Sequence, residues 1–148
     1  MSGHQATESE TARPPEPQLV SDKVRERVET SGLLEPGEVV RAYVNGHGVR
    51  PSLKAATGVL LLPLVARSYR AFVLTDRQIY VFDMKASGAG AVKRVRAKYP
   101  IGSVPVSLTE AHGGWRKLQI EDHMIYVVNR AEPLVPAQAI VDAGGSAG

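Results

Sequence analysis

Seven short runs rich in β-branched and aromatic residues, separated by turn-forming residues, constrain the fold of this 148-residue chain most strongly. Runs of this length and composition are typical of strands, and their regular spacing is typical of an antiparallel sandwich or barrel. The runs span residues 38–44, 68–74, 78–84, 91–98, 103–108, 115–121 and 124–130. We therefore predict a mostly β protein of about seven strands, built as an antiparallel sandwich or barrel.

A helix is predicted at each end of the strand region. Ser21 stands at a capping position and Gly32 at a stop, which predicts an N-terminal helix within residues 19–32. Its apolar positions recur every four residues, at Val20, Val24 and Val28. Because this stripe is narrow, we expect the helix to pack at the edge of the domain or against a partner chain. Pro136 at a helix-start position and Gly144 at a stop predict a short C-terminal helix.

Length and composition indicate a single soluble domain. With 148 residues, 43% of them hydrophobic and 22% charged, the chain has the size and balance of one globular unit. We expect residues 1–18 to be a disordered tail, residues 33–142 to be the domain with an insertion at 45–68, and residues 143–148 to be a flexible end. The chain has no cysteine, which excludes disulfides and thiolate zinc sites. Residues 1–18 also lack the pattern of a signal peptide, so a cytoplasmic protein is predicted.

Formal charge is distributed unevenly along the chain. Residues 1–36 carry four Lys or Arg against seven Asp or Glu, residues 37–100 carry eleven against three, and residues 101–148 carry three against five. The middle of the chain, eleven minus three, therefore holds a net charge of +8 within a total of +3. Such an asymmetry favours an anionic partner, such as lipid head groups, nucleic acid or an acidic protein surface.

The strongest concentration of positive charge lies in the predicted strand 91–98. Side chains alternate along a strand, so Arg94, Arg96 and Lys98 are expected on one face and Lys93 on the other. Three cations about 6 to 7 Å apart would suit successive anionic groups. The alternative is a solvated outer face of the barrel. The predicted anion-binding set adds two arginines that follow the apolar run at 55–66, and it consists of Lys93, Arg94, Arg96, Lys98, Arg67 and Arg70.

Residues 55–66 form the most apolar passage of the chain and contain no charged residue. As a helix the run would be about 18 Å long, whereas a bilayer core is about 30 Å thick, so the run is too short to span a membrane. Two interpretations stay open. The run packs over an open end of the barrel, or it projects between Lys54 and Arg67 and inserts shallowly into an anionic membrane surface. Membrane or partner contact is assigned to its aliphatic residues Val59, Leu60, Leu61, Leu62 and Leu64.

Catalytic motifs are missing from the sequence. The histidines His4, His47, His112 and His123 do not show the spacing of a metal site, and the sequence contains neither a nucleophile elbow nor a phosphate-binding glycine loop. We therefore expect a non-enzymatic protein without a metal or a cofactor.

Three stretches of the chain form a recognisable pattern, LLEPGEVV at 33–40, AFVLTDRQIYVFD at 71–83 and WRKLQIEDHMIYVV at 115–128. Together they resemble the bacterial pleckstrin-homology-like (PH-like) domains, a group related to YokE-like and GRAM-type domains. The resemblance covers residues 33–142 and implies a bent seven-stranded barrel that is capped at one open end by a C-terminal helix. This sequence departs from the family pattern at two places. Pro133 and Pro136 predict a shortened helix, and the insertion at 45–68 is longer than a hairpin loop.

From these observations we predict a non-enzymatic PH-like adaptor that docks on an anionic membrane surface through the basic strand and the apolar insertion. The alternative is a protein–protein interaction or homo-oligomerisation module without lipid binding, which uses the same insertion and the N-terminal valine stripe. Nucleic acid ranks below both partners, because aromatic residues scarcely interleave the basic strand and no predicted helix is basic enough to enter a groove. The predicted location is the cytoplasm, including a peripheral position on the inner face of the membrane.

Overall fold

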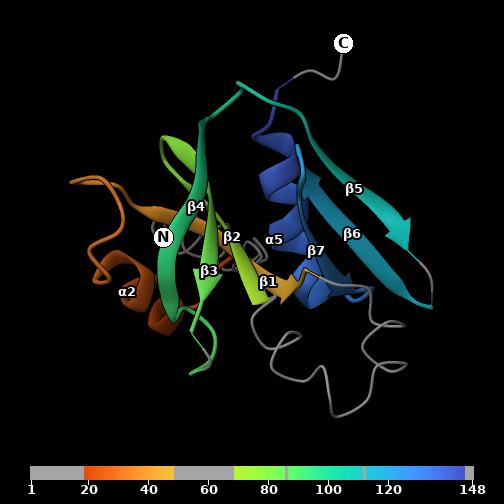
Figure 1. Cartoon of the computed structure of the whole chain (residues 1–148), viewed down its shortest axis with the longest axis horizontal. Coiled ribbons are helices and arrows are strands. Elements are labelled where there is room, and N and C mark those ends of the chain that lie inside the picture. Colours follow the sequence, from red (N-terminus) through yellow and green to blue (C-terminus); the bar gives the residue numbers. More distant parts are fainter. Residues whose placement is uncertain (1–18, 49–68, 86, 112, 146–148) are drawn as a thin grey trace, which may run out of the picture.

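A computed structural model describes residues 19–48, 69–85, 87–111 and 113–145, which form one curled antiparallel sheet with two helices (Figure 1). The strands are β1 (Val40–His47), β2 (Tyr69–Thr75), β3 (Gln78–Met84), β4 (Val92–Pro100), β5 (Val106–Ala111), β6 (Trp115–Ile120) and β7 (His123–Val128). The helices are α2 (Asp22–Glu29) and α5 (Ala131–Asp142). The strand order is β4-β3-β2-β1-β7-β6-β5. The predicted mostly β fold, a bent antiparallel sheet of about seven strands with a helix at each end of the strand region, is confirmed.

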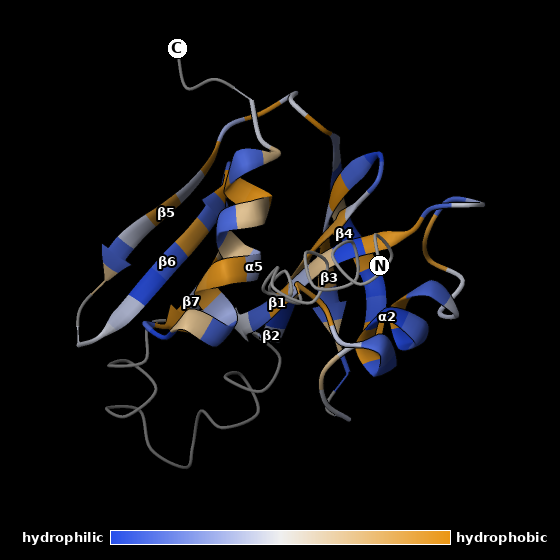
Figure 2. Cartoon of the chain, turned by 180° about the vertical axis from the view of Figure 1, so that it is seen from behind, coloured by the Kyte–Doolittle hydropathy of each residue, from blue (hydrophilic) through white to orange (hydrophobic). Residues whose placement is uncertain are grey.

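The sheet curls into a half-barrel whose two wings, β1–β4 and β5–β7, enclose α5 (Figure 1, Figure 2). The wings join where β1 meets β7, at the pair His47 and Tyr126. α5 contacts strands of both wings and buries Ala137 and Ile140 completely. These residues belong to the inner core, which also contains aliphatic residues of both wings and Phe72. α5 therefore fills the open side of the half-barrel.

α2 covers the opposite face of β1–β4, over a second cluster that we call the outer core. Ser21 caps the helix as predicted, because its hydroxyl accepts a hydrogen bond from the Val24 N–H at 3.2 Å. Val28 is fully buried and Val20 is 5% exposed, in contact with the outer core that also contains Tyr80. The valine stripe packs on the chain's own sheet, which agrees with the first of the two expected arrangements, packing at the edge of the domain.

β1 extends beyond its predicted end. The residues NGHG at 45–48 predict a turn, but β1 continues through His47 and pairs with β2. The reason is a close approach between strands, since a Cβ at Gly46 would lie 2.4 Å from the carbonyl oxygen of Tyr126. Glycine at this position lets β1 contact β7 and does not form a turn. β5 also differs from the prediction, because it begins directly after Pro105, which has no N–H to donate.

α5 begins earlier than predicted and runs through both of its prolines. The helix start predicted at Pro136 is wrong, because the helix extends from Ala131 to Asp142. Pro133 lies in the first turn, where backbone N–H groups have no partner within a helix. Pro136 lacks one helical hydrogen bond, but it is buried against the sheet. Neither proline interrupts the helix, but α5 has only 12 residues, so the predicted short C-terminal helix is confirmed.

The apolar run at 55–66 lies outside the described residues, as does the predicted tail at 1–18. The same holds for the predicted contact and anion-binding residues Val59, Leu60, Leu61, Leu62, Leu64 and Arg67. Among the helices of the described ranges, none is long and apolar enough to cross a membrane.

Replacing Gly46 with alanine is expected to force β1 away from β7. Because a Cβ at this position has no room beside Tyr126 O, we expect the free energy of unfolding to fall by about 3 kcal/mol, the upper end of the usual cost of overpacking. Urea denaturation followed by circular dichroism measures the loss.

Gly32→Ala is the control for this variant. Gly32 has φ +81°, but no atom lies within 4 Å of an added Cβ, so only backbone strain is introduced. We expect that strain to cost about 1 to 2 kcal/mol. A loss for Gly46→Ala no larger than that of Gly32→Ala would contradict the close approach of β1 and β7.

Candidate anion-binding site

Two irregularities in the pairing of β3 with β4 decide where the cations of β4 point. The register shifts between Val81 and Phe82, and again between Asp83 and Met84. At the first shift, the consecutive β3 residues pair with Ala97 and Val95 of β4, so Arg96 between them is left as an extra residue. Such β-bulges interrupt the strict alternation of side chains along a strand.

The bulge at Arg96 reverses the side of the sheet that the following residues face. Val95 packs against the outer core beside α2, whereas Ala97 packs against the inner core beside α5. Lys98 consequently lies on the α2 side, where its Nζ is 3.3 Å from Glu35 Oε2. The prediction that this lysine shares a face with the two arginines of β4 is therefore wrong.

The two arginines of β4 converge on one carboxylate near the end of β3. Asp83 is 6% exposed, and its two oxygens accept hydrogen bonds from Arg94 Nε at 2.5 Å and Arg96 Nε at 2.8 Å. Arg70 pairs with Asp83 across β2 and β3, and its Nε is 3.7 Å from Asp83 Oδ1. We call these four residues, Arg70, Asp83, Arg94 and Arg96, the arginine cluster. Three guanidinium groups and one carboxylate leave it with a net formal charge of +2.

Asp83 orients the guanidinium groups of the cluster. Burial raises the pKa of Asp83, but hydrogen bonds and charge from Arg96 and Arg94 outweigh burial and hold that pKa below its usual value. Both hydrogen bonds use Nε, so the terminal Nη groups keep their N–H donors for other acceptors. The Arg94 side chain is 65% exposed and that of Arg96 is 38% exposed. These donors can therefore be reached from solvent.

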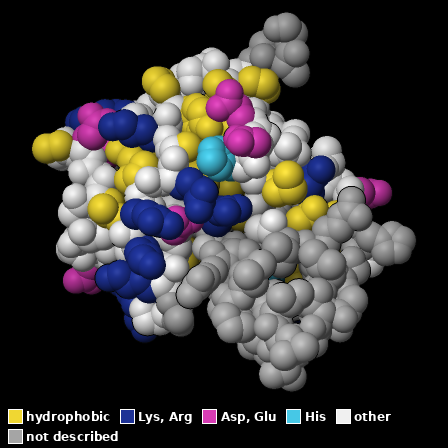
Figure 3. All heavy atoms as spheres, in the orientation of Figure 1, with side chains coloured by type: hydrophobic (Ala, Val, Ile, Leu, Met, Phe, Trp, Pro, Cys, Tyr) yellow, Lys and Arg dark blue, Asp and Glu magenta, His cyan; other side chains and the backbone are white. Residues whose placement is uncertain are grey.

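Positive side chains gather on the surface around the cluster. Figure 3 shows Lys and Arg side chains over β3 and β4, with an acidic side chain among them. A guanidinium group presents a planar fork of donors that matches two oxygens of a phosphate or a carboxylate. The cluster is therefore chemically suited to bind anionic groups.

The structure brings together three of the six predicted cations. Lys93 is not part of the cluster and instead lines a hollow beside α2. Lys98 pairs with Glu35, and Arg67 lies outside the described ranges. Asp83, which holds the cluster together, was not among the predicted site residues.

Counting along the hairpin could have placed Asp83 opposite Arg70. A two-residue turn joins Thr75 to Gln78, and five steps outward along each strand lead to these two residues. No such count predicts the bulge that brings Arg96 to the same carboxylate. The sequence therefore contained a signal for half of the cluster.

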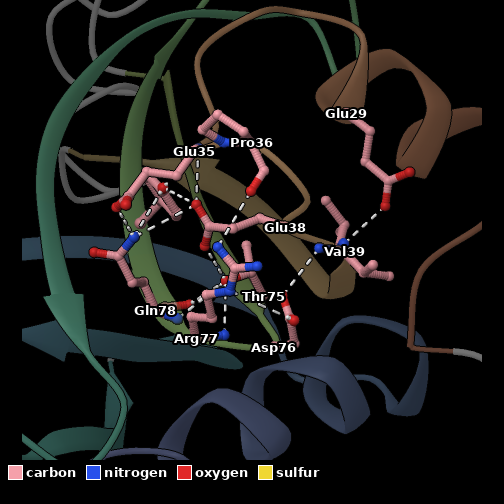
Figure 4. Close-up of polar contacts among 11 residues, drawn as sticks. Glu29, Glu35, Pro36, Glu38, Val39, Thr75, Asp76, Arg77 and Gln78 are labelled. Atoms are coloured by element: carbon pink, nitrogen blue, oxygen red, sulfur yellow. Dashed lines mark hydrogen bonds and ion pairs between the residues drawn. The ribbon is translucent and has the colours of Figure 1, made fainter.

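The turn end of the same hairpin is held by the buried carboxylate of Glu38 (Figure 4). This carboxylate is 6% exposed and accepts hydrogen bonds from Thr75 Oγ1 at 2.5 Å, from the Tyr80 hydroxyl and from the Glu35 N–H at 2.9 Å. Burial raises the pKa of Glu38, but the hydrogen bonds from Thr75 and Tyr80 outweigh burial, and the pKa lies below its usual value. These polar groups are satisfied within the chain, so we assign them to stability.

Two turn residues complete this connection, which we call the Glu38 clamp. Asp76 Oδ1 accepts a hydrogen bond from the Val39 N–H at 3.0 Å, and Arg77 Nη1 donates to the Pro36 carbonyl at 3.2 Å (Figure 4). The clamp therefore joins the EPGE segment before β1 to the turn between β2 and β3. Both segments carry the PH-like resemblance, and in this chain they form one contact.

The histidines of the described ranges do not gather into a site. The rings of His47 and Tyr69 have centroids 4.1 Å apart, and His123 Nε2 lies 3.6 Å from Asp122 Oδ1. Among residues 19–48, 69–85, 87–111 and 113–145, no three His, Asp or Glu side chains are grouped as metal ligands. The arginine cluster is the candidate site.

Comparison of the chain with protein-family models, curated proteins and solved structures finds no match. The resemblance to PH-like domains therefore rests on the sequence motifs.

Replacing Asp83 with asparagine is expected to destabilise the protein in a pH-dependent way. At neutral pH the free energy of unfolding should fall by about 2 kcal/mol, because Arg94 and Arg96 lose a charged acceptor. The pKa of Asp83 is lower in the folded chain than in the unfolded chain, so its stabilisation is complete above about pH 5 and is lost as the pH falls through about 4 and below. The difference between wild type and variant should therefore shrink in acid.

Urea denaturation at a series of pH values measures this difference. Glu110→Gln is the control, because Glu110 is an exposed residue of β5. A difference between wild type and Asp83→Asn that stays constant with pH would contradict the role assigned to the carboxylate.

Proposed function

We propose that this chain is a non-enzymatic PH-like adaptor that binds an anionic membrane surface. The observation that carries the proposal is the arginine cluster, in which three guanidinium groups share one buried carboxylate. Asp83 balances one of the three positive charges, so an excess of +2 is left for an anionic surface. The PH-like label in this proposal rests on the motifs at 33–40, 71–83 and 115–128.

The position of the cluster also supports the proposal. β1 ends at His47, which pairs with Tyr69 at the start of β2, next to Arg70. The segment that connects β1 with β2 is therefore attached at both ends beside the cluster. The apolar run at 55–66 belongs to this segment. It lies outside the described residues, and its insertion into lipid stays a prediction from the sequence.

Charge and apolar contact would supply different parts of the binding free energy. Each Lys or Arg near an anionic leaflet contributes about 1 kcal/mol, so the excess charge of the cluster gives about 2 kcal/mol, a dissociation constant of tens of millimolar. Burying two aliphatic side chains of the run would add about 1.5 to 3 kcal/mol each, which reaches the micromolar range. Charge alone therefore gives weak and reversible docking.

The variant Arg94→Gln/Arg96→Gln is expected to lose affinity for anionic vesicles. Removing two charges worth about 1 kcal/mol each predicts roughly 30-fold weaker binding to vesicles of phosphatidylcholine and phosphatidylserine. Co-sedimentation at several vesicle concentrations measures the affinity, and pure phosphatidylcholine vesicles give the uncharged baseline. Wild-type binding should also weaken as salt is added, because salt screens exposed charges.

The control Arg41→Gln/Arg130→Gln makes the same change in net charge at two exposed residues outside the cluster. We expect it to bind nearly as well as wild type. If the cluster variant and this control bound anionic vesicles equally well, the proposed docking surface would be wrong.

The variant Leu60→Ser/Leu62→Ser distinguishes the two interpretations of the apolar run. If the run inserts into lipid, as we propose, vesicle binding weakens by at least about 100-fold, because two buried aliphatic side chains are lost, while stability is unchanged. If the run instead packs over the barrel, the free energy of unfolding falls by about 2 to 5 kcal/mol for each leucine. Co-sedimentation and thermal unfolding of the same sample separate the two results.

The alternative function is a protein–protein interaction or homo-oligomerisation module, for which two contact surfaces were predicted, the apolar run and the valine stripe. The valine stripe of α2 packs against the outer core, so the apolar run at 55–66 is the remaining contact surface. Light scattering at micromolar concentrations tests this alternative. A dimer or larger assembly that does not bind vesicles would favour it over membrane docking.

A further inference from the structure

A hollow of about 320 Å³ lies between the C-terminal end of α2 and the segment that joins β3 to β4. Three cations from different elements line it: Arg27 of α2, Lys85 after β3 and Lys93 of β4. Hydroxyl groups contribute to the rest of the lining, at Thr30, Ser31 and Ser87. No acidic residue is among the described residues that line the hollow. Its volume is near the lower end of the range for small-molecule sites.

The hollow is built by contacts that hold the β3–β4 segment against α2. Arg27 Nη1 donates to the Ala89 carbonyl at 2.9 Å, and the Gly90 N–H donates to the hydroxyl of buried Tyr43 at 2.9 Å. Gly90 has φ +82°, and an added Cβ would lie 3.3 Å from Val24 Cα, so glycine allows the segment to lie this close to the helix. These contacts fix one wall of the hollow before any ligand binds.

The positive charges of the hollow are not balanced by the described part of the chain. In that part, no ion pair joins Arg27, Lys85 or Lys93 to an acidic side chain. The other cations of β4 do have carboxylate partners, namely Asp83 and Glu35. Cations that converge without a carboxylate repel one another, and a bound anion removes that repulsion. The C-terminal end of α2 supplies only about half a negative elementary charge.

We propose that this hollow binds the phosphate group of a small ligand, as a phosphate ester or as pyrophosphate. A phosphate group carries about two negative charges and several strong acceptor oxygens, which suits donors that approach from three elements. Arg27 uses one N–H on Ala89 and keeps its other donors for a ligand. The hollow lies on the α2 side of β4, whereas the arginine cluster lies beside Asp83 on the α5 side. The phosphate site therefore does not depend on the proposed membrane docking.

An NMR titration of the full chain with inorganic pyrophosphate at constant ionic strength tests the site. We expect saturable shifts of the backbone amides in residues 87–93, which sodium chloride does not reproduce. The variant Lys85→Gln/Lys93→Gln should bind pyrophosphate about tenfold more weakly, because each lost cation faces a doubly charged group. The control Lys23→Gln/Lys117→Gln removes two charges outside the hollow and should keep the dissociation constant within about twofold of wild type. Equal weakening by both variants, or shifts that sodium chloride reproduces, would overturn the proposal.

The two proposals can fail independently. The variant Arg94→Gln/Arg96→Gln is expected to keep pyrophosphate binding while it loses vesicle binding, so loss of one activity does not imply loss of the other. Vesicles with phosphatidylinositol 4-phosphate, compared with phosphatidylserine vesicles of equal charge, identify the source of the phosphate. A preference for the phosphoinositide that Lys85→Gln/Lys93→Gln abolishes assigns the site to a lipid head group. Pyrophosphate binding without that preference assigns it to a soluble phosphate ester.

Discussion

The irregular pairing of β3 with β4 is the constraint on which the candidate site depends. In a regular strand, Arg94, Arg96 and Lys98 would line one face. Arg94 instead pairs directly with Asp83, Arg96 reaches the same carboxylate from the bulge, and the lysine lies beside Glu35. One carboxylate then holds two guanidinium groups by Nε, so their other donors are already oriented. Bulges also make an edge strand a poor template for pairing with another chain. The same irregularity therefore shapes the site and protects the edge of the sheet.

The two ends of the β2–β3 hairpin have different electrostatic roles. At the turn end, the Glu38 clamp satisfies its acidic group with hydrogen bonds from within the chain, and these bonds outweigh burial and lower the pKa of Glu38. At the other end, three arginines share Asp83, and three further cations line a hollow without an acidic residue in its described lining. Negative charge therefore contributes to stability at one end, and positive charge is in excess at the other. The uneven distribution of charge along the sequence becomes an uneven distribution along the sheet.

The strands could be predicted because each depends on a local pattern. Runs of β-branched residues located all seven strands, and the two-residue turn sets the register that places Arg70 opposite Asp83. The predictions were wrong where the local structure depends on a contact with residues distant in the sequence. Gly46 lies in a segment with the composition of a turn, yet it permits contact between β1 and β7. Pro136 is a residue typical of a helix start, yet it lies buried in the middle of α5. The predicted face of Lys98 was wrong because a prediction from simple alternation of side chains does not include the bulge.

Lys93 and Arg94 are neighbours in sequence but belong to different sites, the hollow and the arginine cluster. A membrane surface that meets the start of β4 can contact both sites at once. A phosphate carried by a lipid would then belong to that surface, so its binding in the hollow would add to the binding by the cluster. A soluble phosphate ligand would instead reduce the positive charge that the surface meets, and it would weaken docking. The sign of the coupling between the two sites therefore follows from the source of the phosphate.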